Sequence, residues 1–559
     1  MPDYLWWRDG VIYQIYPRSF ADSTGDGVGD LPGITAHLDY LNDGTPNSLG
    51  VDAIWLSPIY PSPMRDFGYD VANYHDIDPL FGTLADFDRL LAEAHKRGIR
   101  VIMDWVMNHT SDQHPWFRES RASRDNPKRD WYIWRAPTPL PSSPRLQGEG
   151  QVRGVPNNWQ SVFGGPAWTW DEATGQYYLH LFLPQQPDLN WRNPQVHDAI
   201  FNELRFWLDR GVDGFRLDVA DAYYKDAQLR DNPRRLGLRA YDRQQHIYDW
   251  NQPETHEMLQ EFRRLLDQYP ERMAVGEVGQ WHAASYYGSG SDELHLAFNF
   301  AFLECPWSAP AFQRVIEAWD KAVPPAGWPC YVLSNHDQTR HISRYAAGRC
   351  TEARAKVAAT MLLTLRGTPF LYYGEELGLR EGRIPRAEIV DPPGKRYWPL
   401  YKGRDGCRTP MPWNDQPNAG FTAGRPWLRV NPDYRQVNVA AESQNPDSLL
   451  HFYRRLIRLR KTSPALRRGS YRPLIPRPTG CLAYLRETAE QTVLVGLNFR
   501  RRPGTIPLPP GEWRVLLSSV RPTGPETLNF EGIGAGERLR GQEVVLAGNE
   551  AMVAQVNVT

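Results

Sequence analysis

Eight short apolar runs recur along the chain, and most are separated by stretches with the spacing of amphipathic helices. Helix patterns such as residues 84–98 and 196–211 each end in a glycine suited to cap a helix. Strands that alternate with helices form parallel βαβ units, so eight runs predict an α/β fold, a closed (β/α)8 TIM barrel. The runs are residues 11–16, 51–59, 99–106, 212–220, 273–278, 294–300, 330–337 and 369–376.

A doubly wound open sheet is the alternative architecture for the same alternation. Sheets of that kind that bind nucleotides carry a glycine-rich turn after the first strand. The sequence has no such turn after residues 11–16, so we favour the barrel.

The third crossover is much longer than the others. After "VMNHT", about 80 residues precede the next barrel helix, whereas loops of this kind usually have ~2–6 residues. We expect residues 110–191 to form an inserted domain B, and residues 1–109 with 192–468 to form the barrel, domain A. Inside the insert, the Pro-, Ser- and Gly-rich stretch at residues 138–154 predicts an exposed, mobile loop.

The C-terminal part of the chain changes character after the last helix pattern, at residues 449–466. Strand-like runs separated by Pro and Gly turns follow, without an intervening helix pattern. Residues 469–559 therefore predict a C-terminal antiparallel β domain, a β-sandwich that we call domain C. The runs are residues 481–487, 492–499, 512–519 and 543–558.

The composition is that of an ordinary globular protein, with 559 residues and a formal net charge of −1. Near-neutral charge gives no electrostatic reason to expect nucleic acid or a membrane as partner. The N-terminus lacks the pattern of a signal peptide, and the five cysteines are scattered without a CxxC pair. We expect a cytoplasmic enzyme, monomer or homodimer, whose partner is a small molecule. The 21 Trp and 27 Tyr residues are suited to stack on sugar rings.

The run "GFRLDVA", residues 214–220, places two charges inside an apolar strand. Arg216 and Asp218 are two positions apart and therefore share one face of the strand. Other strand ends are polar too, and each such residue alone could merely cap a helix or bind loop backbone. Together, at one end of a barrel, they predict an active site. They are Asp66, Tyr69, Asn108, His109, Glu277, His336 and Asp337.

Three carboxylates, an arginine and two histidines in one pocket suit cleavage of a glycosidic bond, which needs one ionised and one protonated carboxyl. Arg216 beside Asp218 favours an ionised nucleophile. Glu277 lies among apolar and glycine neighbours in the sequence, which favours a protonated general acid. Asp337 can accept hydrogen bonds from two adjacent sugar hydroxyls.

The run "DSTGDGVGD", residues 22–30, alternates oxygen-bearing residues with glycines. This spacing is typical of a loop that binds a hard cation such as Ca²⁺ or Mg²⁺. An Asp/Gly-rich turn without a metal is the alternative. The candidate ligands are Asp22, Thr24, Asp26, the carbonyl of Val28, and Asp30.

The motifs "DWVMNH", "GFRLDVA", "GEV" and "SNHD", in this order, resemble the four signature regions of the α-amylase family, family 13 of the glycoside hydrolases. "QPDLN" (186–190) and "GTPFLYYGEE" (367–376) resemble further signatures of that family. "GRDGCRTPMPW" (403–413) resembles its α-glucosidase and oligo-1,6-glucosidase branch. Relatives in that branch have a similar metal loop with Asn in place of Thr24.

The resemblance implies a retaining mechanism, with Asp218 as nucleophile, Glu277 as acid/base and Asp337 as transition-state stabiliser. It implies that Asp66 together with Arg408 closes the pocket behind the terminal glucose, which makes the enzyme exo-acting. Residues that would bind this glucose are Asp66, Tyr69, His109, Phe163, Phe182, Gln186, Arg216, His336 and Arg408.

We therefore expect an exo-acting retaining α-glucosidase that releases terminal glucose from short oligosaccharides or α-glucosides without a catalytic cofactor. An α-glucosyl transferase or isomerase is the alternative, because it shares the first half-reaction and the same motifs. A non-catalytic relative that acts as an interaction module is disfavoured by the presence of all three acids.

Overall fold

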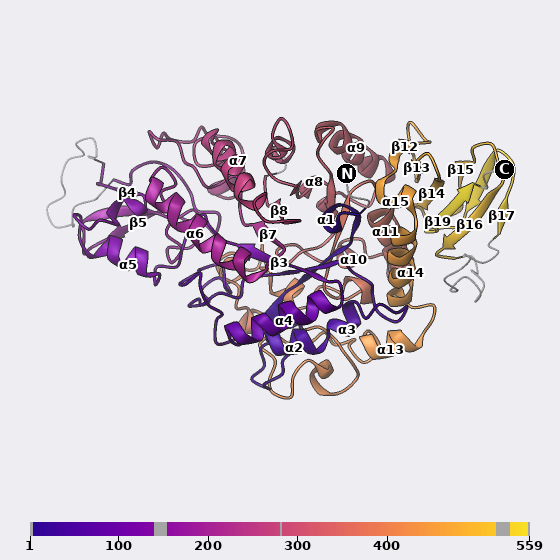
Figure 1. The fold of residues 1–559 in the computed structure, drawn as a ribbon, viewed down its shortest axis with the longest axis horizontal. Helices are drawn as coiled ribbons and strands as arrows, with labels where there is room; N and C mark the ends of the chain where they lie inside the picture. The colour runs from indigo at the N-terminus through magenta and orange to yellow at the C-terminus, as the bar shows by residue number, and fades with distance from the viewer. Residues whose placement is uncertain (1–3, 139–153, 280–281, 521–536, 557–559) are drawn as a thin grey trace.

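We describe a computed structural model of the chain, in which residues 4–138, 154–279, 282–520 and 537–556 are described (Figure 1). The molecule is elongated: the strands of the long insert lie at one end, and the C-terminal sheet lies at the other (Figure 1). Most of the predicted mobile loop, residues 139–153, lies outside the described residues, so that prediction is not tested.

Eight parallel strands form the central sheet and confirm the predicted TIM barrel. Their order is β10-β11-β1-β2-β3-β7-β8-β9, and each of the eight apolar runs coincides with one strand, although β11 begins one residue before its run. The ends of the series meet where Cys330 Sγ donates to the Ala297 carbonyl at 3.0 Å. The strands are β1 (Ile12–Ile15), β2 (Ala53–Leu56), β3 (Arg100–Trp105), β7 (Gly214–Leu217), β8 (Met273–Gly276), β9 (Leu296–Ala297), β10 (Cys330–Val332) and β11 (Thr368–Tyr372).

Helices fill the crossovers, as their sequence patterns predict. Gly211 caps α6 in the left-handed region at φ 103°, which glycine adopts without steric cost. The helix expected at residues 449–466 is two helices, because Ser463 caps a new helix that begins at Pro464. The longer helices are α4 (Leu84–Lys96), α6 (Pro194–Arg210), α7 (Glu254–Leu266), α9 (Ala309–Ala322), α11 (Thr351–Thr364) and α14 (Leu449–Thr462).

Shorter helices lie at the barrel ends and in the loops. They are α1 (Trp6–Asp9), α2 (Leu31–Ala36), α3 (Leu38–Leu41), α5 (Pro115–Ala122), α8 (Phe300–Leu303), α10 (His341–Arg344), α12 (Pro392–Tyr397), α13 (Val439–Gln444) and α15 (Pro464–Arg468).

The insert after β3 contains its own small antiparallel sheet. The strand order is β4 (Trp134–Arg135), β6 (Gln176–Leu179) and β5 (Trp168–Asp171). Phe117 stacks on Trp134 at 5.6 Å, and the Arg129 guanidinium covers the Trp134 ring at 3.5 Å, so aromatic packing holds this sheet together. A backbone bridge from His109 to Asp188 joins the insert to the barrel. The boundary at residues 110–191 stays a prediction.

The C-terminal part is an antiparallel β structure, as expected. A six-stranded sheet has the order β12-β13-β14-β19-β16-β17, and a two-stranded sheet, β15-β18, accompanies it. Leu494, Ile506 and Trp513 belong to the shared core. The strands are β12 (Ser470–Pro473), β13 (Cys481–Glu487), β14 (Thr492–Asn498), β15 (Gly504–Pro507), β16 (Trp513–Ser518), β17 (Arg538–Leu539), β18 (Glu543–Leu546) and β19 (Ala551–Val556).

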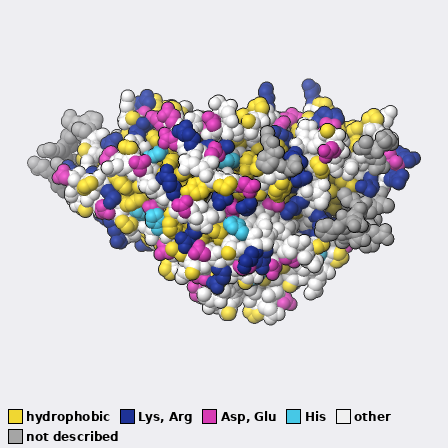
Figure 2. Space-filling view, viewed as in Figure 1, with side chains coloured by type: hydrophobic (Ala, Val, Ile, Leu, Met, Phe, Trp, Pro, Cys, Tyr) yellow, Lys and Arg dark blue, Asp and Glu magenta, His cyan; other side chains and the backbone are white. Residues whose placement is uncertain are grey.

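Acidic and basic side chains are interspersed on the face of the molecule shown in Figure 2, in keeping with the net charge of −1. None of the described helices combines the length and the apolar character needed to cross a membrane.

Candidate active site

A cavity of about 880 Å³ lies at the carboxyl ends of the barrel strands, between the barrel and the insert. Nine of the predicted residues line it, and three more, Arg216, His336 and Arg408, lie buried directly behind its wall. Each of these three is at most 2% exposed. The barrel and the insert together therefore bring all twelve predicted catalytic and substrate-binding residues to one place. Nine of them line the cavity: Asp66, Tyr69, His109, Phe163, Phe182, Gln186, Asp218, Glu277 and Asp337.

Two neighbouring strand ends hold the first two acids. Asp218 directly follows β7 and Glu277 directly follows β8. The backbone ladder continues past both ends, since Glu277 N–H donates to Leu217 at 2.9 Å and Ala220 N–H donates to Glu277 at 2.7 Å. The two carboxyls are thus fixed on adjacent, rigid segments of the barrel rim.

Arg216 connects these acids. Its Nη1 donates to Asp218 Oδ1 and to Asp104 Oδ1, each at 2.7 Å, and its Nη2 donates to Glu277 Oε2. The apolar setting that we expected for Glu277 is therefore wrong, because the arginine reaches it from the next strand. Sequence reasoning also missed Asp104, although a charge inside the apolar run 99–106 is the same signal as Asp218 gives.

The electrostatics of Asp218 and Asp337, two of the proposed catalytic acids, differ. Burial raises the pKa of Asp218; Arg216 opposes this, and the negative charge of Glu277 adds to it. Arg216 thus favours the ionised form as expected, but burial outweighs it. Burial also acts to raise the pKa of Asp337, yet His336, Arg404 and Arg408 overcome it and hold this pKa below its ordinary value. Asp337 is therefore held in its charged form more firmly than Asp218 is.

A chain of hydrogen bonds runs beneath the pocket floor. Gln14 Nε2 donates to His336 Nδ1 at 2.8 Å, so the other ring nitrogen of His336 carries the proton and faces Tyr69 Oη at 2.5 Å. Tyr69 in turn donates to Asp104 Oδ2 at 3.1 Å. Burial lowers the pKa of His336 to about 3, so this histidine is neutral and can donate to a ligand hydroxyl or to Asp337.

Part of the pocket wall is an ion-pair cluster around Arg404. Its Nη2 lies 2.6 Å from Asp66 Oδ1 and 2.7 Å from Asp391 Oδ1, and its Nη1 lies 3.2 Å from Asp337 Oδ1. Arg404 is thus the arginine that contacts Asp66, and the expectation that Asp66 and Arg408 together close the pocket stays a prediction. Arg408 binds Asp337 at 2.8 Å and so shares this carboxylate with Arg404. Arg404 precedes the short 3-10 helix η8 (Asp405–Arg408), and Arg408 ends it.

Three residues near Asp66 or Asp218 have backbone dihedral angles in the left-handed region. Met64 (φ 60°) and Phe67 (φ 52°) flank Asp66, and Val219 (φ 40°) follows Asp218. A β-branched residue there is strained, and such strain is retained where the surroundings fix it. The N–H of Val219 points to Glu277 Oε2 at 3.3 Å, so the strained peptide helps to place the second acid.

The insert contributes the wall opposite the barrel. Phe163 and Phe182 meet edge to face at 5.6 Å, and His109 lies 5.2 Å from Phe182. Gln186 Nε2 is 3.1 Å from His109 Nε2 and donates to Asp66 Oδ2 at 3.4 Å. Burial lowers the pKa of His109 to about 4, so this part of the wall is a neutral donor and acceptor surface.

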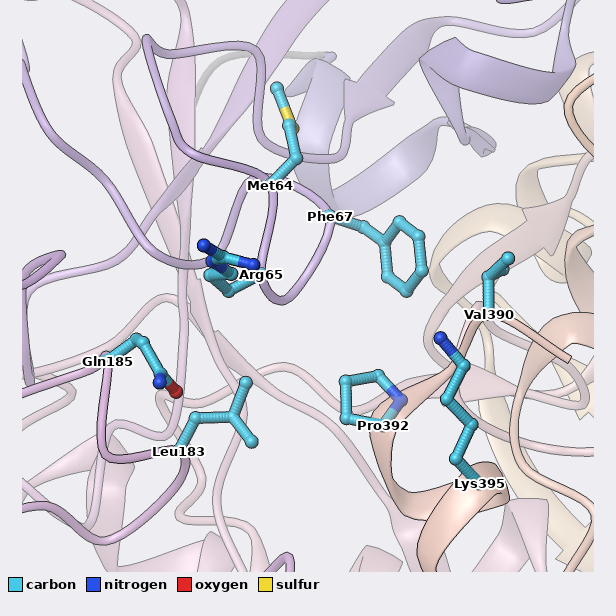
Figure 3. Close-up of a pocket in the computed structure, with 8 residues that line it drawn as sticks. All are labelled: Met64, Arg65, Phe67, Leu183, Gln185, Val390, Pro392 and Lys395. Atoms are coloured by element: carbon cyan, nitrogen blue, oxygen red, sulfur yellow. The ribbon is translucent and has the colours of Figure 1, made fainter.

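A second hollow, of about 460 Å³, lies next to the loop that carries Asp66 (Figure 3). Met64, Arg65 and Phe67 border it on one side, and Pro392 and Lys395 on the other. None of the proposed catalytic acids lines it, so we place the active site in the larger cavity.

The candidate metal loop forms a tight turn. Asp22 Oδ1 accepts from the N–H groups of Thr24 (2.9 Å) and Gly25 (2.8 Å), Asp26 Oδ1 from that of Val28 (2.8 Å), and Asp30 Oδ1 from that of Gly33 (2.6 Å). Among the residues that the structure describes, no group of three or more His, Cys, Asp or Glu side chains is arranged to hold a metal ion. Asp22 and Asp26 shape the loop, and Asp30 caps α2. A bound cation would have to share these carboxylate oxygens with the backbone N–H groups.

Comparisons with known proteins agree with this geometry. Residues 14–469 match the family model "Alpha amylase, catalytic domain". The chain is 47% identical to a probable α-glucosidase of Rhizobium meliloti, over 91% of this chain and 92% of that protein. It is 42% identical to an oligo-1,6-glucosidase of Parageobacillus thermoglucosidasius, over 90% and 92% of the two chains.

Two solved structures are similar over their whole length. An α-glucosyl transfer enzyme has a TM-score of 0.88 and 43% identity, with 99% of this chain and 100% of that chain covered. The trehalulose synthase of Pseudomonas mesoacidophila has a TM-score of 0.85 and 37% identity, with 100% of both chains covered.

Proposed function

The chain belongs to the α-amylase family of glycoside hydrolases, and from this premise we propose that it is an exo-acting, retaining α-glucosidase. Its substrates are short oligosaccharides or α-glucosides with a terminal non-reducing α-linked glucose. The observation that carries the proposal is the contact of one buried arginine, Arg216, with both Asp218 and Glu277 at adjacent strand ends.

In this mechanism Asp218 attacks the anomeric carbon of the terminal glucose while Glu277 protonates the departing glycosidic oxygen. Water, activated by the same glutamate, then releases glucose from the covalent intermediate. Asp337, held ionised by its basic neighbours, binds two ring hydroxyls as positive charge develops on the sugar. No cofactor takes part.

Exo action follows from the closed end of the pocket. The Asp66–Arg404–Asp391 cluster lies where a further sugar on the non-reducing side would have to pass. Charged groups at this position bind the 4- and 6-hydroxyls of a terminal glucose well, because charge-assisted hydrogen bonds are about twice as strong as neutral ones. A chain that continues beyond this glucose would clash with the cluster.

Glucosyl transfer is the second candidate function. It is favoured by the similarity to solved structures of an α-glucosyl transfer enzyme and a trehalulose synthase. The first half-reaction is the same, and the enzymes differ in whether water or a sugar takes the glucose. Incubation with maltose, isomaltose, sucrose and trehalose decides between them: free glucose as main product supports the glucosidase, and new oligosaccharides or isomers support transfer.

The proposal includes a structural calcium ion in the loop of residues 22–30. Its support is the oxygen-rich donor set of Asp22, Thr24, Asp26, the Val28 carbonyl and Asp30. Under this proposal EDTA lowers the melting temperature and added Ca²⁺ restores it, with no direct effect on the chemical step. An unchanged melting temperature in EDTA removes the ion from the proposal.

We place the enzyme in the cytoplasm as a monomer or homodimer. Support for the cytoplasm comes from the five free cysteines, four of them buried, since reduced thiols are typical of that compartment. The proposed domains are A (1–109 and 192–468), B (110–191) and C (469–559), and limited proteolysis near their borders tests them.

A further inference from the structure

The hollow of about 460 Å³ shown in Figure 3 lies outside the catalytic cavity, and the mechanism above does not use it. Its volume is within the range of roughly 300–1,000 Å³ that is usual for small-molecule sites. Two walls face each other across it, the loop after β2 and the segment that begins α12. The loop supplies Met64, Arg65 and Phe67, and the α12 segment supplies Val390, Pro392 and Lys395.

Arg65 and Lys395 give this hollow a positive charge. Both side chains are exposed, and within the described part of the chain neither has an ion-pair or hydrogen-bond partner and no acidic residue lines the hollow. Figure 3 shows the Lys395 side chain extending from α12 toward Phe67 on the facing wall. Two like charges in one hollow repel each other, and both attract an anion that lies between them.

The carboxylates closest in the sequence to the two walls are already bound by other groups. Asp70 accepts the backbone N–H groups of Arg65 and Asp66 at 2.9 and 3.0 Å. Asp66 and Asp391 both bind Arg404, at 2.6 and 2.7 Å. These carboxylates therefore fix the backbone of the loop and the guanidinium of Arg404, and they do not pair with the two exposed cations of the hollow.

The walls of the hollow are linked to the catalytic cavity. One wall includes both chain neighbours of Asp66, and the other includes both chain neighbours of Asp391. Both carboxylates bind the same arginine, Arg404, which lines the catalytic cavity. The Phe67 ring lies 5.5 Å from the guanidinium of Arg408. A molecule that bridges the two walls would therefore act on the carboxylates that hold Arg404.

The apolar part of the lining restricts the chemistry of the ligand. Met64, Phe67, Val390 and Pro392 offer apolar surface on both walls, which a small inorganic anion would leave uncovered. A guanidinium binds phosphate or carboxylate with two parallel hydrogen bonds, and an ammonium group adds a point charge. An organic anion with its charged group between the cations and an apolar body against the walls therefore fits the hollow.

We propose that this hollow is a regulatory site for a small organic anion, a phosphate or carboxylate on an apolar body, which Arg65 and Lys395 bind from opposite walls. The bound anion holds the walls together and keeps Asp66 and Asp391 in place around Arg404. Terminal glucose then meets a preorganised site, which raises its affinity. By linkage, glucose strengthens anion binding by the same factor. The effect on glucose rests on the proposed function, and the binding of the anion does not.

Isothermal titration calorimetry with phenyl phosphate, in the absence of substrate, tests the site. We expect the wild type to bind it and the dissociation constant to rise about 10- to 100-fold in Lys395→Met and in Arg65→Met, as is typical when a hydrogen bond to a charged group is lost. Lys321→Met, at an exposed lysine of α9, is the matched control and should stay within about twofold of the wild type.

Two further probes separate the parts of the ligand. Benzoate carries a carboxylate on the same ring, so the tighter of the two ring compounds identifies the preferred anionic group. Inorganic phosphate lacks the apolar body and should bind at least about tenfold more weakly than phenyl phosphate, because no apolar surface is buried. Equal affinity for inorganic phosphate would overturn the assignment of the apolar walls to the ligand body.

Steady-state kinetics test the link to the catalytic cavity, with the disaccharide that the enzyme cleaves best. Saturating phenyl phosphate should lower KM about fivefold in the wild type and leave it unchanged in Lys395→Met. Without the anion, both variants should keep kcat/KM within about twofold of the wild type, since neither side chain belongs to the catalytic machinery.

Absence of binding by both phenyl phosphate and benzoate overturns the inference, and so does binding that both variants leave unchanged. Binding with an unchanged KM overturns the regulatory role. Competitive inhibition by phenyl phosphate that is equal in the wild type and the variants shows binding in the catalytic cavity and also overturns it. A wild type that cleaves none of the disaccharides overturns the proposed function, whereas the calorimetry still decides the anion site.

Discussion

Arg404 donates a 2.6 Å hydrogen bond to Asp66, which lies 338 positions earlier in the chain. The contact joins the loop after β2 to the segment after α12, two parts of the barrel rim that only the closed fold brings together. Asp391 holds Arg404 from the other side at 2.7 Å. Arg404 is therefore fixed between two carboxylates, and we call this group, which we propose closes the pocket, the clamp.

Replacing the cation of this clamp should cripple the enzyme. Arg404→Ala leaves Asp66 and Asp391 as buried carboxylates without their partner, and it removes a donor near Asp337. We expect kcat/KM for maltose to fall about 100-fold or more, since loss of a charged hydrogen bond costs ~1.5–3 kcal/mol and the orphaned charges add to it. Steady-state kinetics measure the loss.

The matched control for the clamp is Arg386→Ala, because Arg386 is an exposed arginine of the long connection between β11 and α13, which also contains Arg404. It should change kcat/KM by less than about twofold, as is usual for isolated surface positions. Wild-type activity of Arg404→Ala would contradict the assignment of this arginine to the closed end.

The two acids joined by Arg216 should respond differently to substitution. Asp218→Asn removes the nucleophile and should abolish turnover of every substrate. Glu277→Gln removes the proton donor, so it should lose activity on maltose but keep much more of it on α-glucosyl fluoride, whose leaving group needs no protonation. The ratio of the two rates, measured for each variant, distinguishes the roles. Equal losses of Glu277→Gln on both substrates would argue against it as the acid.

The sequence predicted the strands and the polar residues at their ends, because apolar periodicity and abrupt polar positions are local signals. It predicted that Arg216 lies beside Asp218, which the structure shows, but it did not predict that Arg216 contacts Glu277 or that Arg404 contacts Asp66. Arg216 and Glu277 are 61 positions apart and meet only across the β7–β8 pair, so the chain neighbours of Glu277 gave a misleading, apolar picture. Arg404 and Arg408 are four positions apart, on either side of η8, so sequence position did not distinguish which of them contacts Asp66.

The buried carboxyl of Glu375 should make the free energy of unfolding depend on pH. Glu375, after β11, accepts from Tyr453 Oη at 3.1 Å, and burial raises its pKa from 4.5 to about 8. The folded state thus binds this proton more tightly than the unfolded state does. Its contribution is present in full below about pH 4.5 and is lost as the pH rises through about 8.

Glu375→Gln keeps the acceptor for Tyr453 but cannot ionise. As the pH rises from about 5 to about 8.5, the melting temperature of the variant should fall less than that of the wild type. At about pH 8.5 the variant should melt a few degrees higher than the wild type. Thermal denaturation scans at several pH values measure this. Glu388→Gln, at an exposed glutamate that pairs with Arg429, is the control and should follow the wild type. Parallel curves for Glu375→Gln and the wild type would contradict the prediction.

The stereochemistry of the product tests the double displacement directly. A retaining enzyme needs its two carboxyls about 5–5.5 Å apart, and an inverting enzyme needs about 6.5–9.5 Å to admit water between carboxyl and sugar. Asp218 and Glu277 bind the same guanidinium of Arg216 through its two terminal nitrogens, which favours the shorter separation. Two successive inversions at the anomeric carbon then restore its configuration.

The anomer first released from maltose should be α-glucose, observed by proton NMR within the first minutes, before mutarotation mixes the anomers. A spectrum that begins with β-glucose would show a single displacement by water and would remove Asp218 from its role as nucleophile.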